Sequence, residues 1–308
     1  MIETDGLAKN YGSFLALRGI DLRVESGDIY GFIGPNGAGK TTTIRILTTL
    51  MEPTSGTATV CGLDVRDNKA LIRGMIGYMP DSFGVYQDMT VVEYLHFFAA
   101  AYGIPHRERA SLVGGLLELT DLSYKSGALI DNLSRGMHQR LALARTLVHD
   151  PEVLILDEPA SGLDPRARVE IREILRELRS MGKTILLSSH ILSELEEVCT
   201  RIGIIEQGEL VTQGTIEEVM AGANEHKAVV VHTDDDARAA VVLLEIPGVL
   251  GVSRNESASE LVLKVADALD LADIGRHLYS RELGLRRLES RKPSLEDIFM
   301  SLTKGVVQ

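Results

Sequence analysis

Apolar residues in the first two thirds of the chain fall into short runs separated by longer amphipathic stretches. The runs at 29–33, 153–156, 184–187 and 202–205 are almost wholly apolar, which is typical of strands buried on both faces. The stretch from Pro165 to Met181 carries apolar residues at helical spacing and predicts a long amphipathic helix. Strands that alternate with helices in this way predict an α/β domain with a parallel sheet.

Strands of another kind are expected at the start of the chain. Residues 3–25 alternate apolar and polar positions around Tyr11-Gly12, which indicates short antiparallel strands joined by a turn. Thr57–Val60 reads as a further strand, and Ile72–Tyr78 as another. The sheet core of this domain is therefore expected to be mixed rather than purely parallel.

A helical block is predicted between the parts of this α/β core. Thr90 stands three residues before Glu93, which is the spacing of a capping box, and we expect the helix that it opens to run through Ala101. Helical periodicity continues through residues 104–148, with helices near 107–119 and 135–148. We therefore expect a helical subdomain at about 88–150.

The polar and glycine-containing stretch 221–227 breaks the α/β pattern and predicts a linker. The order of elements beyond it is βαββαβ with a terminal helix, which is typical of a small ferredoxin-like α+β domain. Its predicted elements are strand 228–232, helix 235–245, strands 249–254 and 259–265, helix 269–282, strand 284–290 and helix 294–302. The chain is thus divided into one domain at 1–220 and a second at 226–308.

The composition of the chain limits which partners and which cellular compartment can be expected. The chain has 308 residues and a formal net charge of −12, which argues against a nucleic-acid-binding surface. Its two cysteines are too few for a disulfide framework or a metal site, so reduced thiols are expected. The N-terminus resembles no signal peptide, and no apolar stretch approaches the ~20 residues needed to span a bilayer. We expect an acidic cytosolic protein, with any membrane span supplied by another polypeptide.

A phosphate-binding loop follows the first buried strand. Its residues are Gly34, Pro35, Asn36, Gly37, Ala38, Gly39, Lys40 and Thr41, followed by Thr42. They match G-x-x-x-x-G-K-[ST], in which a glycine-rich backbone cradles phosphates at the start of a helix. Lys40 would supply a point charge to the β and γ phosphates, and the Thr41 hydroxyl would hold Mg²⁺. The sequence therefore predicts a nucleotide site, with a helix following over 41–50.

Two acidic residues end the buried run at 153–156. Asp157 and Glu158 stand where the carboxyl end of a parallel strand faces a ligand crevice. Beside a complete phosphate loop, Asp157 is expected to bind Mg²⁺ and Glu158 to polarise the water that attacks the γ phosphate. In isolation, the same pair could simply end a strand in solvent.

Three other features allow two interpretations each. Tyr11 is either an ordinary strand aromatic or part of the nucleotide site. Ser134 is a natural N-cap of the helix that follows, so an ordinary capped helix is the first interpretation and an anion site the alternative. A lone histidine such as His190 usually has a structural role, but its place after the strand at 184–187 favours a site at the ligand end of the sheet.

Together these motifs resemble an ATP-binding cassette (ABC) ATPase over roughly residues 2–220. The ordered set is Tyr11, Gly34 to Thr42, Leu133 to Gln139, Leu154 to Glu158, Ser161-Gly162-Leu163-Asp164 and His190. A signature at Leu133 to Met137 ahead of Asp157-Glu158 distinguishes this class from other phosphate-loop proteins. The phrases Ser188 to Leu192 and Pro293 to Phe299 resemble the separate ATPase subunits of bacterial drug-resistance exporters, which carry a C-terminal accessory domain.

The resemblance implies roles for individual residues. Tyr11 would stack on adenine, Glu158 would be the catalytic base, and His190 would contact the γ phosphate. Ser134 and Gly136 would act in trans, closing over the ATP that a second copy holds. Asp164 would cross the interface between the two copies and link their sites.

Two departures from the family pattern stand out. The family commonly has glutamine where this chain has Asp81, a residue that touches Mg²⁺ and the attacking water and whose loop communicates with the membrane partner. Arg135 and Met137 replace the commonest Gly and Gln of the signature, whereas Ser134 and Gly136 are retained.

These features predict an ATPase subunit that binds ATP and Mg²⁺, dimerises around two ATP molecules and drives a separate membrane permease, as an exporter. We expect it at the inner face of the cell membrane, held there through the permease. A soluble ABC module acting on ribosomes or DNA is a rival, disfavoured by the single cassette and the acidic charge. A regulatory ATP binder that does not hydrolyse is another rival, which Asp81 keeps open and Glu158 and His190 disfavour.

Overall fold

The computed structural model describes residues 1–82, 84, 88–222, 227–255, 260–266, 269–291 and 294–303. The chain forms two compact units. The first holds Met1–Ile216 together with the chain end from Leu302, and the second holds Glu217–Ser301. Each unit has its own sheets and its own core, and each is described by itself below.

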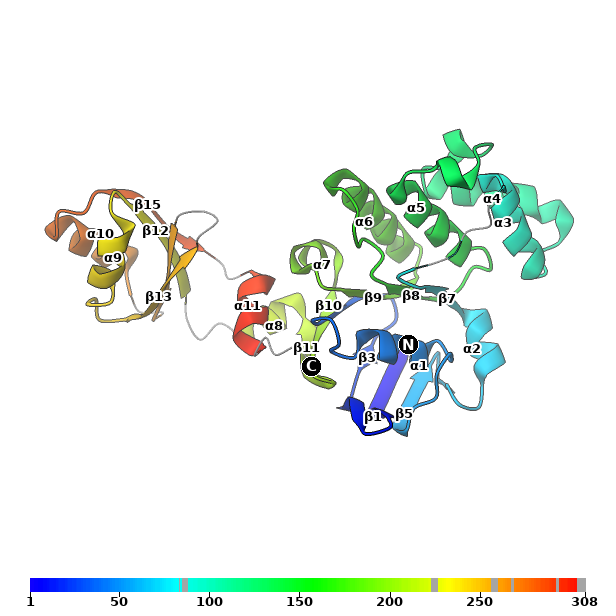
Figure 1. Cartoon of the computed structure of the whole chain (residues 1–308), viewed down its shortest axis with the longest axis horizontal. Coiled ribbons are helices and arrows are strands. Elements are labelled where there is room, and N and C mark those ends of the chain that lie inside the picture. Colours follow the sequence, from blue (N-terminus) through cyan, green and yellow to red (C-terminus); the bar gives the residue numbers. More distant parts are fainter. Residues whose placement is uncertain are drawn as a thin grey trace. The chain divides into compact units, whose positions relative to one another are not determined.

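A six-stranded sheet forms the centre of the first unit (Figure 1). Its order is β11-β10-β4-β9-β8-β7, and every neighbouring pair is parallel except β10 with β11. The bounds are β4 Ile29–Ile33, β7 Ile76–Met79, β8 Val153–Asp157, β9 Thr184–Ser189, β10 Arg201–Glu206 and β11 Glu209–Thr215. All residues of β4, β8 and β9 are buried, which confirms the strands predicted from continuous apolar runs.

A second, antiparallel sheet comes from the beginning of the chain. Its order is β2-β1-β5-β6, with β3 paired to β1. The bounds are β1 Ile2–Tyr11, β2 Phe14–Ile20, β3 Arg23–Val24, β5 Ser55–Val60 and β6 Leu63–Asp64. The predicted antiparallel strands of residues 3–25 are thus confirmed, and the core of the unit is mixed as expected.

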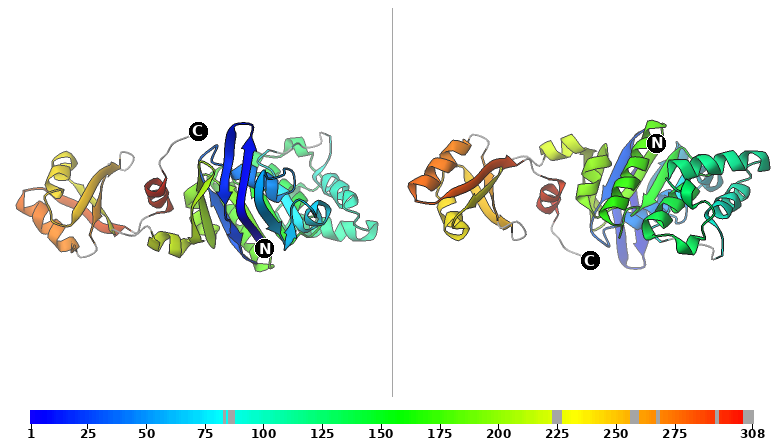
Figure 2. Two further views of the ribbon diagram at one scale, coloured as in Figure 1. Left: turned by 90° about the horizontal axis from the view of Figure 1, so that it is seen from below. Right: turned by 90° about the horizontal axis from the view of Figure 1, so that it is seen from above.

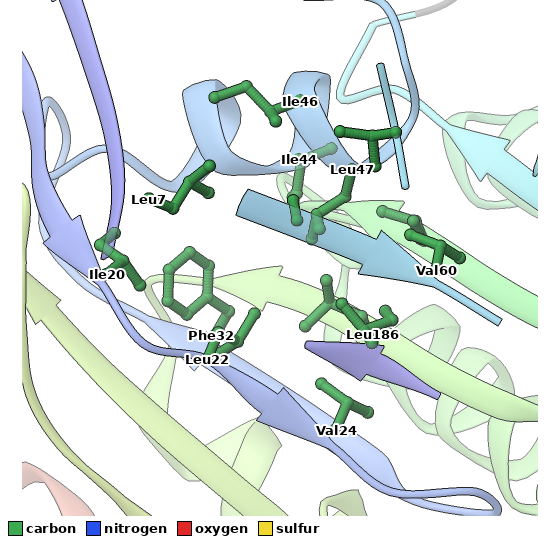
Figure 3. Packing of buried hydrophobic residues seen from close by; sticks show 14 of the residues in the cluster. Leu7, Ile20, Leu22, Val24, Phe32, Ile44, Ile46, Leu47, Val60 and Leu186 are labelled. Atoms are coloured by element: carbon green, nitrogen blue, oxygen red, sulfur yellow. The ribbon is translucent and has the colours of Figure 1, made fainter. Parts of the chain in front are cut away.

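The main core of this unit lies between the two sheets and includes helix α1, Lys40–Leu47. Figure 3 shows Leu7 and Ile20 of the antiparallel sheet, Ile44 of α1, and Phe32 and Leu186 of the central sheet facing one another. All five of these side chains are fully buried. Burial of such a side chain stabilises the fold by about 1.5–3 kcal/mol, so this core fixes the helix that follows the phosphate loop against both sheets.

Helices cover the other face of the central sheet. Helices α5, α6 and α7 lie on that side, and α1 and the antiparallel strands lie on the opposite side (Figures 1 and 2). The bounds are α2 Lys69–Met75, α3 Val91–Ala101, α4 His106–Leu119, α5 Arg135–Thr146, α6 Pro165–Ser180 and α7 Leu192–Val198. Short 3₁₀ turns stand at Ser123–Lys125 and Ile130–Asn132. The Thr90–Glu93 capping box is present as predicted.

One predicted strand is wrong over its first half. Residues 72–75 belong to helix α2, and the strand β7 begins at Ile76. The apolar residues Ile72 and Ile76 stand four apart, a spacing that fits both a helix face and a strand face. Ile72 is the buried residue of α2, so a short helix of 7 residues uses it before the chain enters the sheet.

The second unit has the predicted βαββαβ order. A four-stranded antiparallel sheet of order β13-β14-β12-β15 carries two helices, α9 and α10, and its core includes side chains of both. The bounds are β12 Lys227–Thr233, α9 Asp236–Leu243, β13 Val249–Asn255, β14 Glu260–Val265, α10 Leu271–Ser280 and β15 Leu285–Arg291. Helix α8, Ile216–Gly222, precedes this domain, and α11, Leu295–Leu302, follows it. The arrangement is ferredoxin-like, as expected; Pro293, in the exporter-like phrase, lies outside the described residues.

Candidate functional site

The phosphate-binding loop connects β4 to α1. At Gly39, the N-cap of α1, φ is 113°, and an added Cβ would lie 2.6 Å from Leu17 Cδ2, so glycine is required there on two counts. Within the described part of the chain, no side chain caps α1. The first N–H groups of a helix have no partner inside the helix, and their direction favours an anion. The loop is therefore built to receive phosphate groups.

Lys40 is held inside this loop. Its ammonium donates to the carbonyl oxygens of Gly34 at 2.5 Å and Pro35 at 3.2 Å, and it lies 3.7 Å from Glu158 Oε1. The side chain is 6% exposed. Burial lowers the pKa of Lys40 below its ordinary value, and the carboxylates of Glu158 and Asp157 oppose that shift. The lysine thus joins the phosphate loop to the acidic pair.

The acidic pair is organised by a residue that the sequence argument left without a role. Ser188, at the end of β9, donates its hydroxyl proton to Asp157 Oδ1 at 2.6 Å and accepts from the Glu158 N–H at 2.9 Å. Ser188 is fully buried, and Asp157 is 2% exposed. The register pairs Asp157 with Ser188 across the parallel strands. A polar residue at the carboxyl end of the neighbouring buried strand was the available signal, because such ends meet at one edge of a sheet.

His190 contacts the other member of the acidic pair. Its Nδ1 lies 2.8 Å from Glu158 Oε2. Glu158 has φ of 52°, in the left-handed region that non-glycine residues rarely occupy, and such strain concentrates at functional sites. The Glu158 carboxylate is therefore placed between Lys40 and His190, one on each of its two oxygens.

One pocket brings most of the predicted site residues together. It is lined by Tyr11, Phe14, Ala16, Pro35, Asn36, Gly37, Gly39, Lys40, Thr41, Thr42, Asp81, Asp157 and Glu158. Gly34 and Ala38, the other two residues of the loop, do not line this pocket; Gly34 accepts from Lys40, and Ala38 is buried. The backbone of the glycine-rich loop, two threonine side chains and three carboxylates thus line one space.

The aromatic wall of the pocket has a second member that the sequence argument missed. Tyr11 and Phe14 are paired at the end of the β1–β2 hairpin and are 45% and 48% exposed. The Tyr11 hydroxyl contacts Met51 Sδ at 3.0 Å, and Lys9 Nζ lies 5.6 Å from the centre of the Tyr11 ring. Two exposed aromatics at one turn give a surface on which a flat base can stack. The signal was the aromatic residue on each side of the predicted turn.

The remaining predicted residues lie in a second pocket. Ser134 caps α5 by accepting from the Met137 N–H at 3.3 Å, which confirms the predicted N-cap. Gly136 stands in the first turn of α5, and Asp164 caps α6 by accepting from the Ala167 N–H at 2.7 Å. All three line this second pocket and none lines the first. The single chain therefore presents the predicted site residues in two separate pockets rather than in one enclosed site.

Comparison with known proteins decides the family. A model described as ABC transporter matches residues 17–161, and one described as ATP-binding protein DrrA1-3-like, C-terminal domain, matches residues 214–303. Nod factor export ATP-binding protein I of Paraburkholderia xenovorans is 36% identical over 308 residues, covering 100% of this chain and 98% of that protein. The chain belongs to the ABC transporter family. Daunorubicin resistance ATP-binding protein DrrA3 of Streptomyces coeruleorubidus is another relative of this ABC ATPase, 34% identical and covering 98% of this chain and 95% of that protein.

Solved structures agree on the fold of the ABC ATPase. The ATP binding subunit of an ABC transporter has a TM-score of 0.65 and 31% identity, covering 72% of this chain and 92% of that one. CbiO1 from Clostridium perfringens, part of the transporter complex cbiONQ, has a TM-score of 0.66 and 27% identity, covering 80% and 95%. The dimeric bacterial cassette MJ0796 has a TM-score of 0.64 and 25% identity, covering 70% and 99%.

The described residues of this ABC ATPase contain neither a membrane-spanning helix nor a metal site made of side chains alone. No described helix combines the length and the apolar character that a membrane span requires. No group of three or more His, Cys, Asp or Glu side chains in the described ranges could hold a metal ion. Mg²⁺ is commonly bound through one or two carboxylates together with substrate phosphates, and the pocket at the phosphate loop offers that kind of oxygen donor.

Proposed function

We propose that the chain is the ATP-hydrolysing subunit of an exporter, working as a pair of copies on a separate transmembrane permease. The observation that carries the proposal is the junction of Lys40, Glu158 and His190 at the phosphate loop. Relatives named for Nod factor export and daunorubicin resistance support the export direction. The chain would lie at the inner face of the cell membrane, held there by the permease.

Hydrolysis in this site would be phosphoryl transfer to water, achieved mostly by positioning and charge neutralisation. Lys40 and the N–H groups of the loop would hold the phosphates, while Tyr11 stacks on adenine. Glu158 would accept a proton from the attacking water, with His190 on its Oε2 contacting the γ phosphate. The remaining loop residues, Gly34 to Thr42, would shape the phosphate cradle.

Magnesium fits the donors in this pocket. The Thr41 hydroxyl and the carboxylates of Asp157 and Asp81 line one space, and hard oxygen donors suit Mg²⁺. The ion would neutralise charge on the phosphates when bound. Ser188 keeps Asp157 turned towards that space by donating to its Oδ1.

A second copy would complete the site. Ser134 and Gly136 would close over the γ phosphate of ATP held by the other copy, with the α5 N-terminus directed at it. Asp164 would lie at the interface between the copies. The match of separate family models to 17–161 and 214–303 supports an ATP-binding domain at 1–220 and an accessory domain at 226–308.

The test is the variant Glu158→Gln, which keeps the size of the side chain and removes its basicity. We expect loss of turnover by about 10²-fold or more, the contribution typical of general base catalysis, with ATP binding retained. Glu118→Gln, at an exposed position on α4, is the matched control and should hydrolyse ATP as the wild type does. Wild-type turnover in Glu158→Gln would exclude the assigned base.

A second measurement addresses the paired copies and the permease. ATP should convert Glu158→Gln from monomer to dimer in analytical ultracentrifugation, because the trapped nucleotide is held between copies. The tagged full chain should co-purify with an integral membrane protein from detergent-solubilised membranes. A strictly monomeric chain with full activity would overturn the paired site.

A further inference from the structure

Arg135 joins the first turn of α5 to the segment that precedes α6. Its Nη2 donates to the Ser161 carbonyl oxygen at 3.1 Å. The guanidinium also lies against Gly162, where an added Cβ would stand 2.4 Å from Arg135 Cζ. Gly162 has φ of 68°, so its backbone conformation and the close approach of Arg135 both favour glycine.

The segment also contacts α6 and the residues just before it, since the Ser161 N–H donates to the Glu158 carbonyl at 3.1 Å. Arg168 Nε donates to the Leu163 carbonyl at 2.9 Å, and Asp164 caps the helix through the Ala167 N–H. Ala167 in turn faces the signature, because a Cβ at Gly136 would stand 2.9 Å from the Ala167 Cβ. Residues 161–164 are therefore held from α6 on one side, and Arg135 provides the tie from α5.

The hydrogen bond of Arg135 is expected to contribute little to the stability of the fold and more to the position of the segment that it contacts. Arg135 and Gly162 are exposed, and hydrogen bonds at the surface contribute little to stability. The same contact has a larger effect on geometry, because it fixes an exposed segment against the serine and glycine that would meet the partner's ATP. A surface that is ordered before binding avoids the cost of ordering it on binding.

We propose that Arg135 is a positioning residue that fixes the segment Ser161–Asp164 relative to Ser134 and Gly136, so that one copy presents both to the other as a preformed surface. This proposal rests on the paired site proposed above. It gives a reason for one departure from the commonest signature, since a glycine at 135 has no side chain to reach Ser161.

The experiment combines Arg135→Ala with Gly162→Ala in the Glu158→Gln chain, and measures ATP-dependent dimerisation by analytical ultracentrifugation. We expect Arg135→Ala to weaken dimerisation about fivefold, the equivalent of one modest hydrogen bond, with ATP affinity of the monomer unchanged. Arg135→Lys keeps a cationic hydrogen-bond donor on a long side chain and should recover part of the loss. Arg107→Ala, in the first turn of α4 and 86% exposed, is the matched control and should dimerise normally.

The double variant distinguishes positioning from direct contact with phosphate. If the guanidinium lies against Gly162 in the working dimer, Gly162→Ala should weaken dimerisation less in the Arg135→Ala chain than in the chain that keeps Arg135. The double variant should then lose less dimerisation affinity than the product of the two single losses. Effects that simply multiply would overturn the proposal and indicate that Arg135 acts on the partner's ATP. Unchanged dimerisation in Arg135→Ala would also overturn it. Failure of the Glu158→Gln parent to dimerise with ATP would instead reject the paired site itself.

Discussion

The hydroxyl of Ser188 donates to the carboxylate of Asp157 across 2.6 Å, between the ends of two adjacent parallel strands. The same oxygen accepts the N–H of Glu158, the residue with a left-handed backbone. One buried hydroxyl thus orients the proposed metal ligand and holds the backbone of the proposed base. Residues that orient metal ligands commonly have a strong effect on metal affinity or activity.

Ser188→Ala should therefore lower ATP turnover by about 10- to 100-fold, as loss of such an orienting partner typically does. The Mg²⁺ concentration for half-maximal rate should rise, because the Asp157 carboxylate loses its fixed orientation. Steady-state ATPase assays at varied Mg²⁺ measure both the turnover and the Mg²⁺ concentration for half-maximal rate. Ser180→Ala removes a hydroxyl from the exposed end of α6 and serves as control. Unaltered kinetics in Ser188→Ala would show that Asp157 needs no such partner.

Asp81 offers a second test within the same pocket. It is exposed and lies with Asp157 on the phosphate-loop pocket. If the charge of Asp81 helps to hold Mg²⁺ through water, Asp81→Asn should raise the Mg²⁺ requirement about fivefold. Two unit charges about 4 Å apart in water attract by roughly 1 kcal/mol, which corresponds to about that factor. Asp81→Gln introduces the residue common in the family, which is longer than Asp81 and uncharged. An Mg²⁺ titration that is identical for wild type and Asp81→Asn would remove Asp81 from the metal site.

The sequence was most informative where spacing along the chain determines geometry. A phosphate loop needs its glycines, lysine and hydroxyl at fixed offsets, so Gly34 to Thr42 can be recognised without knowledge of the fold. Buried strands such as β8 and β9 were recognisable because a strand covered on both faces leaves no polar position. The capping box at Thr90 was equally local.

Contacts between distant segments were beyond the sequence. The bond from Ser188 to Asp157 depends on which strands are neighbours and on their register, neither of which a single apolar run reveals. The contact of Arg135 with Ser161 depends on how two helices start side by side. Ile72 was misassigned because a short helix and a short strand can share the same apolar spacing. The fold class thus followed from local pattern, and the organisation of the site required the tertiary structure.

His149 should make stability depend on pH. Its Nε2 donates to the Ile76 carbonyl at 2.9 Å, its ring stacks on Tyr102 with centroids 4.0 Å apart, and its Nδ1 is buried without a partner in the described structure. Burial lowers the pKa of His149 below 6.5; the Ile76 bond and Asp150 oppose that shift, and Lys183 adds to it. Because the folded pKa is depressed, its contribution to stability is complete above the ordinary histidine pKa and is lost as pH falls through the lowered value.

The free energy of unfolding should therefore fall between pH 7 and pH 5 by up to about 1.4 kcal/mol per pH unit from this group. His149→Gln should flatten that dependence while lowering stability throughout, because the ring contact with Tyr102 is lost. Urea denaturation at a series of pH values gives both quantities. His106→Gln, at the exposed start of α4, should leave the pH dependence as it is. An equally steep profile in His149→Gln would contradict the assignment.

The buried carboxylate of Glu194 should make stability depend on pH in the opposite direction to His149. Arg168 Nη1 lies 2.9 Å from Glu194 Oε1 and joins α6 to the helix that follows His190. Glu194 is 7% exposed, and burial raises its pKa above 4.5 although Arg168 and Arg172 oppose the shift. A carboxyl with a raised folded pKa contributes stability that is complete below its unfolded pKa and is lost as pH rises through the folded value. Removing Arg168 should extend that loss, because it leaves the carboxylate charged and less compensated.

We expect Arg168→Met to destabilise the chain by about 2–3 kcal/mol at pH 8, somewhat less than for a fully buried pair because Arg168 is partly exposed. The difference from wild type should shrink as pH falls from 8, because protonation of Glu194 removes the unpaired charge. Glu194→Gln should restore much of the lost stability in the Arg168→Met chain, since no buried charge remains to be paired. Arg176→Met, which removes an exposed contact to the Glu197 carbonyl, should cost under about 1 kcal/mol at any pH. A constant difference between Arg168→Met and wild type across this range would show that lost packing, rather than the unpaired carboxylate, determines the cost.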